Sequence, residues 1–399
     1  MGVSRLIEVL LVALRLGLTS FGGPVAHIGY FREEYVNRRG WLSDERFAEL
    51  VALCQFLPGP ASSQLGIAIG TGRAGYLGGF LAWLGFTMPS AVALAAFAYG
   101  VHEFGGDGGG WLDGLKIAAV AVVAFALWGM GRTLTPDRTR ISIAVVAAAA
   151  LLLTGGVAAQ VLVILSGAVL GLVLLKPSET QAAGDSGSGG AARATGARIG
   201  VLTLLLFGAA LLALPAVARS VDSEPLSVAD SFYRSGSLVF GGGHVVLPLL
   251  EAEVVPTEWV TKDEFLAGYG AAQAVPGPLF TFSAYLGTVM GVLDPWWLGG
   301  LLALGAIFLP SFLLVWGVLP FWERLRGFAR VRRALMGVNA AVVGILLAAL
   351  YDPVWTSAIG APEDFALGAA AFVLLAFWKT PPWLVVALAA VGGAGLAAL

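Results

Sequence analysis

The residues of this sequence that could do chemistry are glycines and prolines that interrupt apolar runs. One run reaches Phe21-Gly22-Gly23-Pro24, and a later run stops at Pro58-Gly59-Pro60. Glycine and proline break helices, and a broken helix presents free N–H groups at the positive end of its dipole. Because such helix ends bind anions, the two breaks indicate a site for a negatively charged ligand.

Both breaks recur in the second half of the chain, in the same order. Their counterparts are Phe240-Gly241-Gly242-Gly243 and Pro276-Gly277-Pro278, and the dipeptide Pro89-Ser90 recurs downstream as Pro310-Ser311. A single Gly-Gly in a membrane helix more often serves close packing, and a single proline is a tolerated kink. Recurrence of both motifs at matching places favours breaks that build a binding site.

An arginine precedes each Phe-Gly-Gly motif, Arg15 in the first half and Arg234 in the second. On insertion scales an uncompensated arginine inside a membrane helix costs about 2.5 to 3.5 kcal/mol. Two interpretations stay open. The guanidinium groups either face a protein cavity, where they could bind an oxyanion in a bidentate fork, or reach up to the lipid headgroups.

Two further pairs of polar residues match between the halves. Glu34 and Glu253 could carry a coupled proton or pair with the arginines, although a solvated loop carboxylate is the simpler interpretation. Gln55 and Gln273 each lie three residues before a Pro-Gly-Pro break. Their amides could donate hydrogen bonds to an oxyanion or serve helix packing, and both alternatives stay open.

The composition places these residues in a membrane. Hydrophobic residues make up 58% of the chain and charged residues 12%, with a mean hydropathy of +0.85. So few charges cannot cover a water-soluble surface, and a net charge of −2 offers nothing to nucleic acid. The single cysteine, Cys54, excludes an internal disulfide and a cysteine-built metal site, so we expect neither metal nor cofactor.

The motifs of common enzymes and pumps are missing from the sequence. It contains no His-Glu-x-x-His, no Gly-x-Ser-x-Gly and no phosphate-binding glycine loop followed by lysine. An integral-membrane enzyme is therefore the weakest functional class. An ATP-driven pump contained in this chain is excluded on the same ground.

Hydropathy divides the chain into two repeats joined by a connecting segment. Since a hydrocarbon core of about 30 Å needs about 20 helical residues, several runs are long enough to span it. Residues 141–154 and 157–175 are shorter and predict a helical hairpin. The expected helices of the first half are 3–23, 47–70, 75–101, 112–131, 141–154 and 157–175. The expected domains are a first repeat over 1–175, a flexible polar linker over 176–198, an extra membrane helix and connection over 199–226, and a second repeat over 227–399.

Charge bias gives an expected topology. Basic residues gather at 132–140, 176–198 and 324–333, which the positive-inside rule assigns to the cytoplasm. The pattern predicts an all-α polytopic membrane protein with two inverted repeats of about six helices each plus one extra connecting helix, about 13 spans in all, with the N-terminus inside and the C-terminus outside. The arginine-rich loop 32–46 would then lie outside and its acidic counterpart, 251–264, inside. Both placements violate the rule, so broken or re-entrant helices remain the alternative.

At these residues the sequence resembles the chromate ion transporter (CHR) family, in its long two-repeat form. The resemblance rests on Phe21-Gly22-Gly23-Pro24, on Trp41 and Phe47, on the run from Gln55 to Pro60, and on the matching motifs of the second half. It implies a secondary transporter that exports chromate across the cell membrane and confers chromate resistance, with sulfate as the competing anion. A carrier or channel of the same architecture for sulfate or another ion is the alternative.

The expected partners are therefore chromate or sulfate and the lipid bilayer, without nucleic acid; the oligomeric state stays open, a homodimer included. Chromate and sulfate are tetrahedral dianions that need donors in place of water. The candidate substrate-binding residues are Arg15, Phe21, Gly22, Gly23, Gln55, Pro58, Gly59, Pro60, Arg234, Phe240, Gly241, Gly242, Gln273, Pro276, Gly277 and Pro278, with Glu34 and Glu253 as candidate proton or ion-pair residues.

Overall fold

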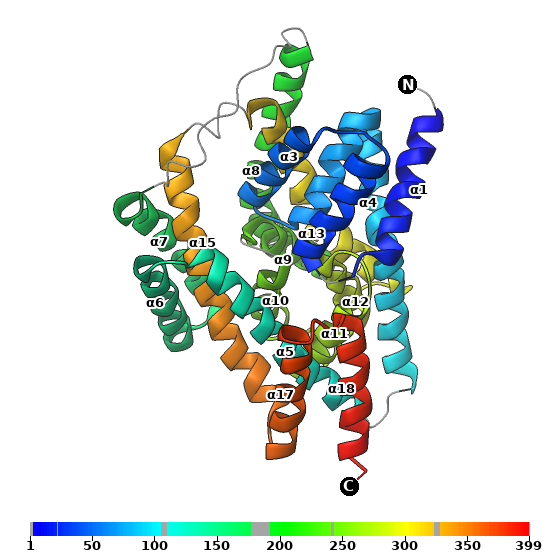
Figure 1. Ribbon diagram of the computed structural model, residues 1–399, viewed down its shortest axis with the longest axis vertical. Helices are drawn as coiled ribbons and strands as arrows, with labels where there is room; N and C mark the ends of the chain where they lie inside the picture. Colours follow the sequence, from blue (N-terminus) through cyan, green and yellow to red (C-terminus); the bar gives the residue numbers. More distant parts are fainter. Residues whose placement is uncertain are drawn as a thin grey trace.

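The structure, a computed structural model, describes residues 3–21, 23–104, 110–176, 192–240, 243–322 and 328–398. Within these ranges the chain is helical and contains no strand, as expected for an all-α protein (Figure 1). Gly22, Gly241 and Gly242 lie outside the described residues, as does most of the linker predicted at 176–198.

The helices of the first half follow the expected boundaries closely, with one exception. They are α1 (Val3–Thr19), α2 (Gly23–Phe31), the π-helical turn η1 (Arg32–Arg38), α3 (Asp44–Phe56), α4 (Ala61–Phe104), α5 (Gly110–Leu134), α6 (Arg138–Thr154) and α7 (Gly156–Leu174). The exception is the run 47–70, expected as one span, which the structure divides at Pro58-Gly59-Pro60 into the end of α3 and the start of α4.

The second half repeats this order after α8 (Ala192–Val221), the extra apolar helix. Its elements are α9 (Glu224–Leu238), η3 (Gly243–Val245), α10 (Val246–Val254), α11 (Lys262–Ala274), η4 (Leu279–Thr281), α12 (Phe282–Val289), α13 (Trp297–Val318), η5 (Leu319–Phe321), α15 (Ala329–Ala349), η6 (Leu350–Trp355), α16 (Thr356–Ala358), α17 (Pro362–Ala376) and α18 (Pro382–Leu396).

Five segments in the described residues are helical, long and apolar enough to cross a membrane. They lie in α4, α5, α8, α13 and α15. Their outward faces are apolar: Leu212 on α8 is 79% exposed, a position suited to lipid rather than water. The chain is therefore a membrane protein. The expected count of 13 spans is not confirmed, because several helices beside the breaks are short, with 8 residues in α12 and 13 in α3 and α11.

The short helices of the first repeat enter the fold and return to the same end. Helix α4 reverses at Ala74 and Gly75, where φ of Gly75 is 73°. Near the start of α1, Glu8 pairs with Arg39, which follows η1, and with Arg73, which lies at the reversal, at 3.5 and 3.0 Å. The beginning of α1, the arginine-rich loop and the α4 reversal therefore share one end of the molecule.

This placement differs from the 13-span interpretation, which put the arginine-rich loop on the far side of the membrane from the N-terminus. Helices α1 and α2 form one pair that returns toward the end where α1 begins, and α3 and the first arm of α4 form another. The reason is that glycine or proline separates the two helices of each pair, so the chain can reverse its direction there. Hydropathy windows do not distinguish two such half-helices from one span.

The corresponding loop of the second half lies at the opposite end. Lys262, at the start of α11, is 3.4 Å from Asp352 in η6, after the end of α15, and Asp263 is 3.2 Å from Lys116 near the start of α5. The two chain termini also lie at opposite ends of the long axis (Figure 1). This arrangement agrees with inverted repeats, which remain a prediction for the membrane.

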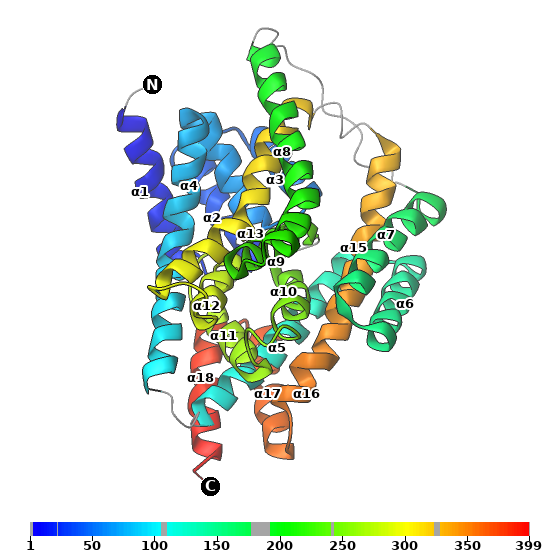
Figure 2. The ribbon, with the colours of Figure 1, turned by 180° about the vertical axis from the view of Figure 1, so that it is seen from behind.

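Each repeat packs its last hairpin against the other repeat. Helices α6 and α7 lie against α15, where the backbones of Gly167 and Gly337 touch, and α17 and α18 lie against α5, where the backbones of Gly114 and Gly393 touch. Both views show α15 beside α6 and α7 (Figure 2). One buried cluster therefore runs through both halves of the chain.

Candidate functional site

Each Pro-Gly-Pro break is hydrogen-bonded to the other repeat. The N–H of Gly59 donates to the carbonyl of Val239 at 2.7 Å, and the N–H of Gly277 donates to the carbonyl of Ser20 at 2.9 Å. Val239 and Ser20 directly precede Phe240 and Phe21. The helix breaks of the two repeats therefore meet in two crossed contacts, called here the first crossing (Gly59, Val239) and the second crossing (Gly277, Ser20).

Both crossings need glycine at the break. Gly59 has φ of 120° and Gly277 has φ of 96°, a region that other residues rarely adopt. A Cβ on Gly59 would lie 2.9 Å from Ser311 Oγ, and one on Gly277 would lie 2.8 Å from Ser90 Oγ. Sequence reasoning did not single out these two serines as site residues. The sequence feature that could have indicated them is the Pro-Ser dipeptide, which recurs as Pro89-Ser90 and Pro310-Ser311.

Matching caps hold the helices that lead into the breaks. The hydroxyl of Ser43 accepts from the N–H of Arg46 and starts α3, while Thr261 and Glu264 form a capping box at the start of α11. Both helices end before their Pro-Gly-Pro because proline disfavours helical geometry at the preceding residue. The spacing from cap to break therefore fixes where each half-helix stops.

A helix or helical turn starts after each break, which supplies the free N–H groups that an anion site requires. These starts are Gly23 of α2, Ala61 of α4, Gly243 of η3 and Leu279 of η4.

The histidines after the glycine motifs lie at the breaks, although they do not align in sequence. His27 is buried, with Nε2 3.2 Å from the Ser20 carbonyl and Nδ1 3.2 Å from Ser62 Oγ. The carbonyl requires a donor, so Nε2 carries the proton and Nδ1 accepts from the serine. His244 Nδ1 is 2.9 Å from the Tyr269 hydroxyl, and a Cβ on Gly23 would lie 3.9 Å from His244 Nε2.

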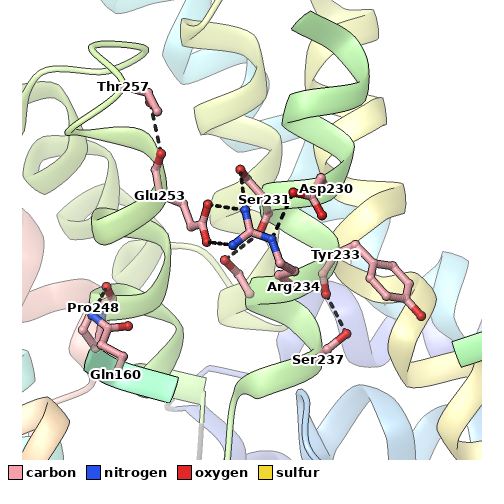
Figure 3. Close-up of polar contacts among 10 residues, drawn as sticks. Gln160, Asp230, Ser231, Tyr233, Arg234, Ser237, Pro248, Glu253 and Thr257 are labelled. Carbon is pink, nitrogen blue, oxygen red and sulfur yellow. Dashed lines mark hydrogen bonds and ion pairs between the residues drawn. The ribbon is translucent and has the colours of Figure 1, made fainter. Parts of the chain in front are cut away.

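The guanidinium of Arg234 is held by carboxylates. Its two terminal nitrogens donate to Glu253 at 2.6 and 2.8 Å, and Nε donates to Asp230 at 3.0 Å (Figure 3). Both acidic side chains are over 90% buried. The fork that could bind an oxyanion is therefore occupied by Glu253.

The corresponding pair in the first repeat is looser. Arg15 lies 3.6 Å from Glu34, which also accepts from Arg38 at 3.2 Å and Arg39 at 2.7 Å. The Arg15 side chain is 56% exposed, compared with 26% for Arg234. Of the sequence alternatives, the structure places the glutamates as partners of the arginines. Among the described residues, neither arginine has a hydrogen bond or ion pair to a residue of a break.

The remaining candidates divide between buried and exposed positions. Gln55 is exposed, whereas Nε2 of Gln273 is buried without a partner in the described residues. Phe21 packs on Trp383 with ring centroids 6.2 Å apart, and the carbonyl of Pro58 accepts from Gln64 Nε2 at 2.6 Å. Phe240, Pro60, Pro276 and Pro278 flank the crossings along the chain.

Broken helices that meet around buried polar groups, inside a shell of apolar helices, define a membrane transport protein. The family model described as chromate transporter matches residues 7–172 and 226–394, and the chain belongs to the chromate transporter family. The two matched segments leave out residues 173–225, which lie between them.

Several curated proteins are similar to the chain over nearly its whole length. A chromate transport protein of Pseudomonas aeruginosa is 30% identical over 397 residues, covering 96% of this chain and 90% of that protein. A probable chromate transport protein of Synechococcus elongatus is 27% identical over 390 residues, covering 95% and 93%. A chromate transport protein of Cupriavidus metallidurans is 26% identical over 394 residues, covering 97% and 92%. No solved structure matches the chain.

Proposed function

We propose that this protein is a secondary transporter that exports chromate across the cell membrane and so confers chromate resistance. The observation that carries the proposal is the pair of crossings, in which the breaks of both repeats meet through Gly59 and Gly277. Helix ends placed there offer donors for a tetrahedral oxyanion at the point where the two repeats meet. The names of the relatives supply the choice of chromate.

The membrane potential suffices to drive export. A dianion leaving a cell that is negative inside gains about 2.3 kcal/mol per charge per 100 mV, or about 4.6 kcal/mol for two charges. Uptake against the same potential would need a coupled cation or a counter-anion. Export therefore needs no ATP and no coupled ion.

Transport in everted vesicles tests this function. Labelled chromate should accumulate inside vesicles that hold a positive interior potential, and a potassium ionophore that abolishes the potential should stop accumulation. An excess of unlabelled sulfate should compete, because it presents the same charge and shape. Vesicles that carry neither anion would favour a carrier or channel for another ion, and accumulation that follows only a pH gradient would contradict the potential-driven mechanism.

The re-entrant arrangement predicts the sides of two matching loops. Asn37 and Pro256 are exposed counterparts in the arginine-rich and acidic loops, and the native Cys54 is buried. Because basic loops stay in the cytoplasm, Asn37→Cys should react with an impermeant thiol reagent only after lysis, whereas Pro256→Cys should react in whole cells. The reverse pattern of labelling would support the 13-span topology.

A further inference from the structure

The two crossings differ in the helix that follows the break. At the first crossing α4 starts directly after Pro60, and its first helical bond is from the N–H of Gln64 to the Pro60 carbonyl at 2.9 Å. The N–H groups of Ala61, Ser62 and Ser63 precede this bond, and none has an acceptor within the described part of the chain. The first crossing therefore presents a free helix N-terminus.

At the second crossing one of the three equivalent N–H groups is used. The chain forms the 3-10 turn η4, in which the N–H of Thr281 donates to the Pro278 carbonyl at 3.0 Å. The Thr281 hydroxyl donates to the same carbonyl at 2.7 Å. The tight turn uses one backbone donor, the N–H of Thr281, that the start of an α-helix leaves free.

The serine and threonine hydroxyls also differ between the two crossings: two are unpartnered at the first crossing, and their counterparts at the second are hydrogen-bonded. Ser63 corresponds to Thr281 and Ser311 to Ser90, and all four are buried. The hydroxyls of Ser63 and Ser311 have no partner in the described residues, whereas Ser90 Oγ donates to the Thr87 carbonyl at 3.1 Å. Leaving a buried polar group unpaired costs about 1 to 3 kcal/mol, so two at one break indicate a missing ligand.

Neighbouring residues strengthen the contrast. Ser62 and Gln64 of the first repeat correspond to Phe280 and Phe282 of the second, which are fully buried and apolar. Gln64 Nε2 and Ser311 Oγ both lie within 3 Å of where a Cβ on Gly59 would be, so Gln64 and Ser311 flank the first break. By donating to the Pro58 carbonyl, Gln64 also occupies a backbone acceptor of the first break, which would otherwise repel an anion.

Three other buried groups without a partner in the described residues lie nearer the second crossing: Ser20 Oγ, Thr87 Oγ1 and Gln273 Nε2. The Ser20 carbonyl accepts from the N–H of Gly277 and lies 3.2 Å from His27 Nε2, and His27 Nδ1 is 3.2 Å from Ser62 Oγ, so Ser20 lies between the second crossing and the start of α4. Its counterpart in the second repeat is Val239, which has no polar side chain. Thr87 lies inside α4 and Gln273 lies before the 3-10 turn η4, so neither is at the first residues of an α-helix, as Ser63 is.

We infer that one tetrahedral oxyanion binds at the first crossing only, at the N-terminus of α4, with the hydroxyls of Ser63 and Ser311 and the free N–H groups as its donors. The anion is recognised by neutral donors and the helix dipole, not by an arginine. The inference rests on the proposed function for its ligand class. It adds that the pseudo-symmetric centre holds one anion rather than two.

Equilibrium binding of labelled chromate to the purified full-length protein in lipid nanodiscs tests this inference. Wild type should bind one chromate per chain, and Ser63→Ala and Ser311→Ala should each raise Kd at least tenfold. The matched controls Thr281→Val and Ser90→Ala, at the second crossing, should change Kd less than twofold. Two anions per chain, or equal losses at both crossings, would overturn the single site.

Thermal unfolding of the same four variants separates binding from folding. Ser63→Ala and Ser311→Ala remove hydroxyls that bond nothing in the ligand-free protein, so Tm without chromate should not fall. Thr281→Val and Ser90→Ala each remove a hydrogen bond, so Tm should fall. Wild-type Kd in both first-crossing variants would refute the site while leaving chromate binding intact, whereas a wild type that binds neither chromate nor sulfate would refute the proposed function itself.

Discussion

Replacing Arg234 with glutamine is expected to cost about 3 to 5 kcal/mol of folding free energy, because it breaks a buried ion pair and leaves charges without a partner. Glu253 and Asp230 are both over 90% buried and both accept from this guanidinium. A neutral amide could not compensate two carboxylates. Thermal unfolding in nanodiscs should show a large drop in Tm, with little folded protein at 37 °C.

The corresponding substitution in the first repeat is the control. Arg15 is 56% exposed and lies 3.6 Å from Glu34, which keeps Arg38 and Arg39 as partners. Arg15→Gln should therefore cost less than about 1 kcal/mol. The double variant Arg234→Gln with Glu253→Gln should recover part of the lost stability. If Arg234→Gln kept wild-type Tm but lost chromate binding, the arginine would have to be a ligand of the anion.

Gly59→Ala and Gly277→Ala are expected to abolish chromate transport. Alanine would face a φ of 120° or 96°, and its Cβ would lie 2.6 Å from Gln64 Nε2 at the first break or 2.8 Å from Ser90 Oγ at the second. Relief of these contacts requires the break to move, which pulls apart the hydrogen bond to the other repeat. Chromate accumulation in everted vesicles should fall to the level of empty vesicles, with the protein still inserted.

Gly155→Ala separates backbone strain from steric contact. Gly155 has φ of 65°, but a Cβ there would meet nothing within 4 Å. Its substitution should cost about 1 kcal/mol and leave transport near wild type. Transport at wild-type rates in Gly59→Ala and Gly277→Ala would show that the crossings are not part of the transport path.

The sequence predicted the membrane class, the helical fold and the recurrence of the breaks because each depends on local composition and spacing. It could not predict that Gly59 meets Val239 and Gly277 meets Ser20, since those contacts join segments from different repeats. The ion pairs were easier to predict from the sequence, because the spacing from Arg15 to Glu34 equals the spacing from Arg234 to Glu253. Equal spacing was a usable signal that each glutamate belongs with its arginine.

The run 47–70 shows why the sequence predicts more membrane spans than there are described helices of spanning length. It is mainly apolar and long enough to cross a bilayer, yet the structure ends α3 at Phe56 and starts α4 at Ala61. Hydropathy measures the average solvent preference of a segment, which is the same for a crossing helix and for two half-helices that turn back. The sequence also could not predict the unpartnered hydroxyls of Ser63 and Ser311. Serine is common in membrane helices, and only the folded structure shows which serines lack a partner.

The crossed contacts also set an order for biosynthesis. When the ribosome has completed the first repeat, the N–H of Gly59 has no acceptor, because Val239 is not yet made, and helices α6 and α7 have no α15 to pack on. The nascent first repeat therefore stays partly folded in the membrane until the second repeat is made. In that state we expect it to be bound by chaperones and degraded by quality-control proteases. Two separately translated halves, cut between α7 and α8, should each be degraded when made alone and survive when made together.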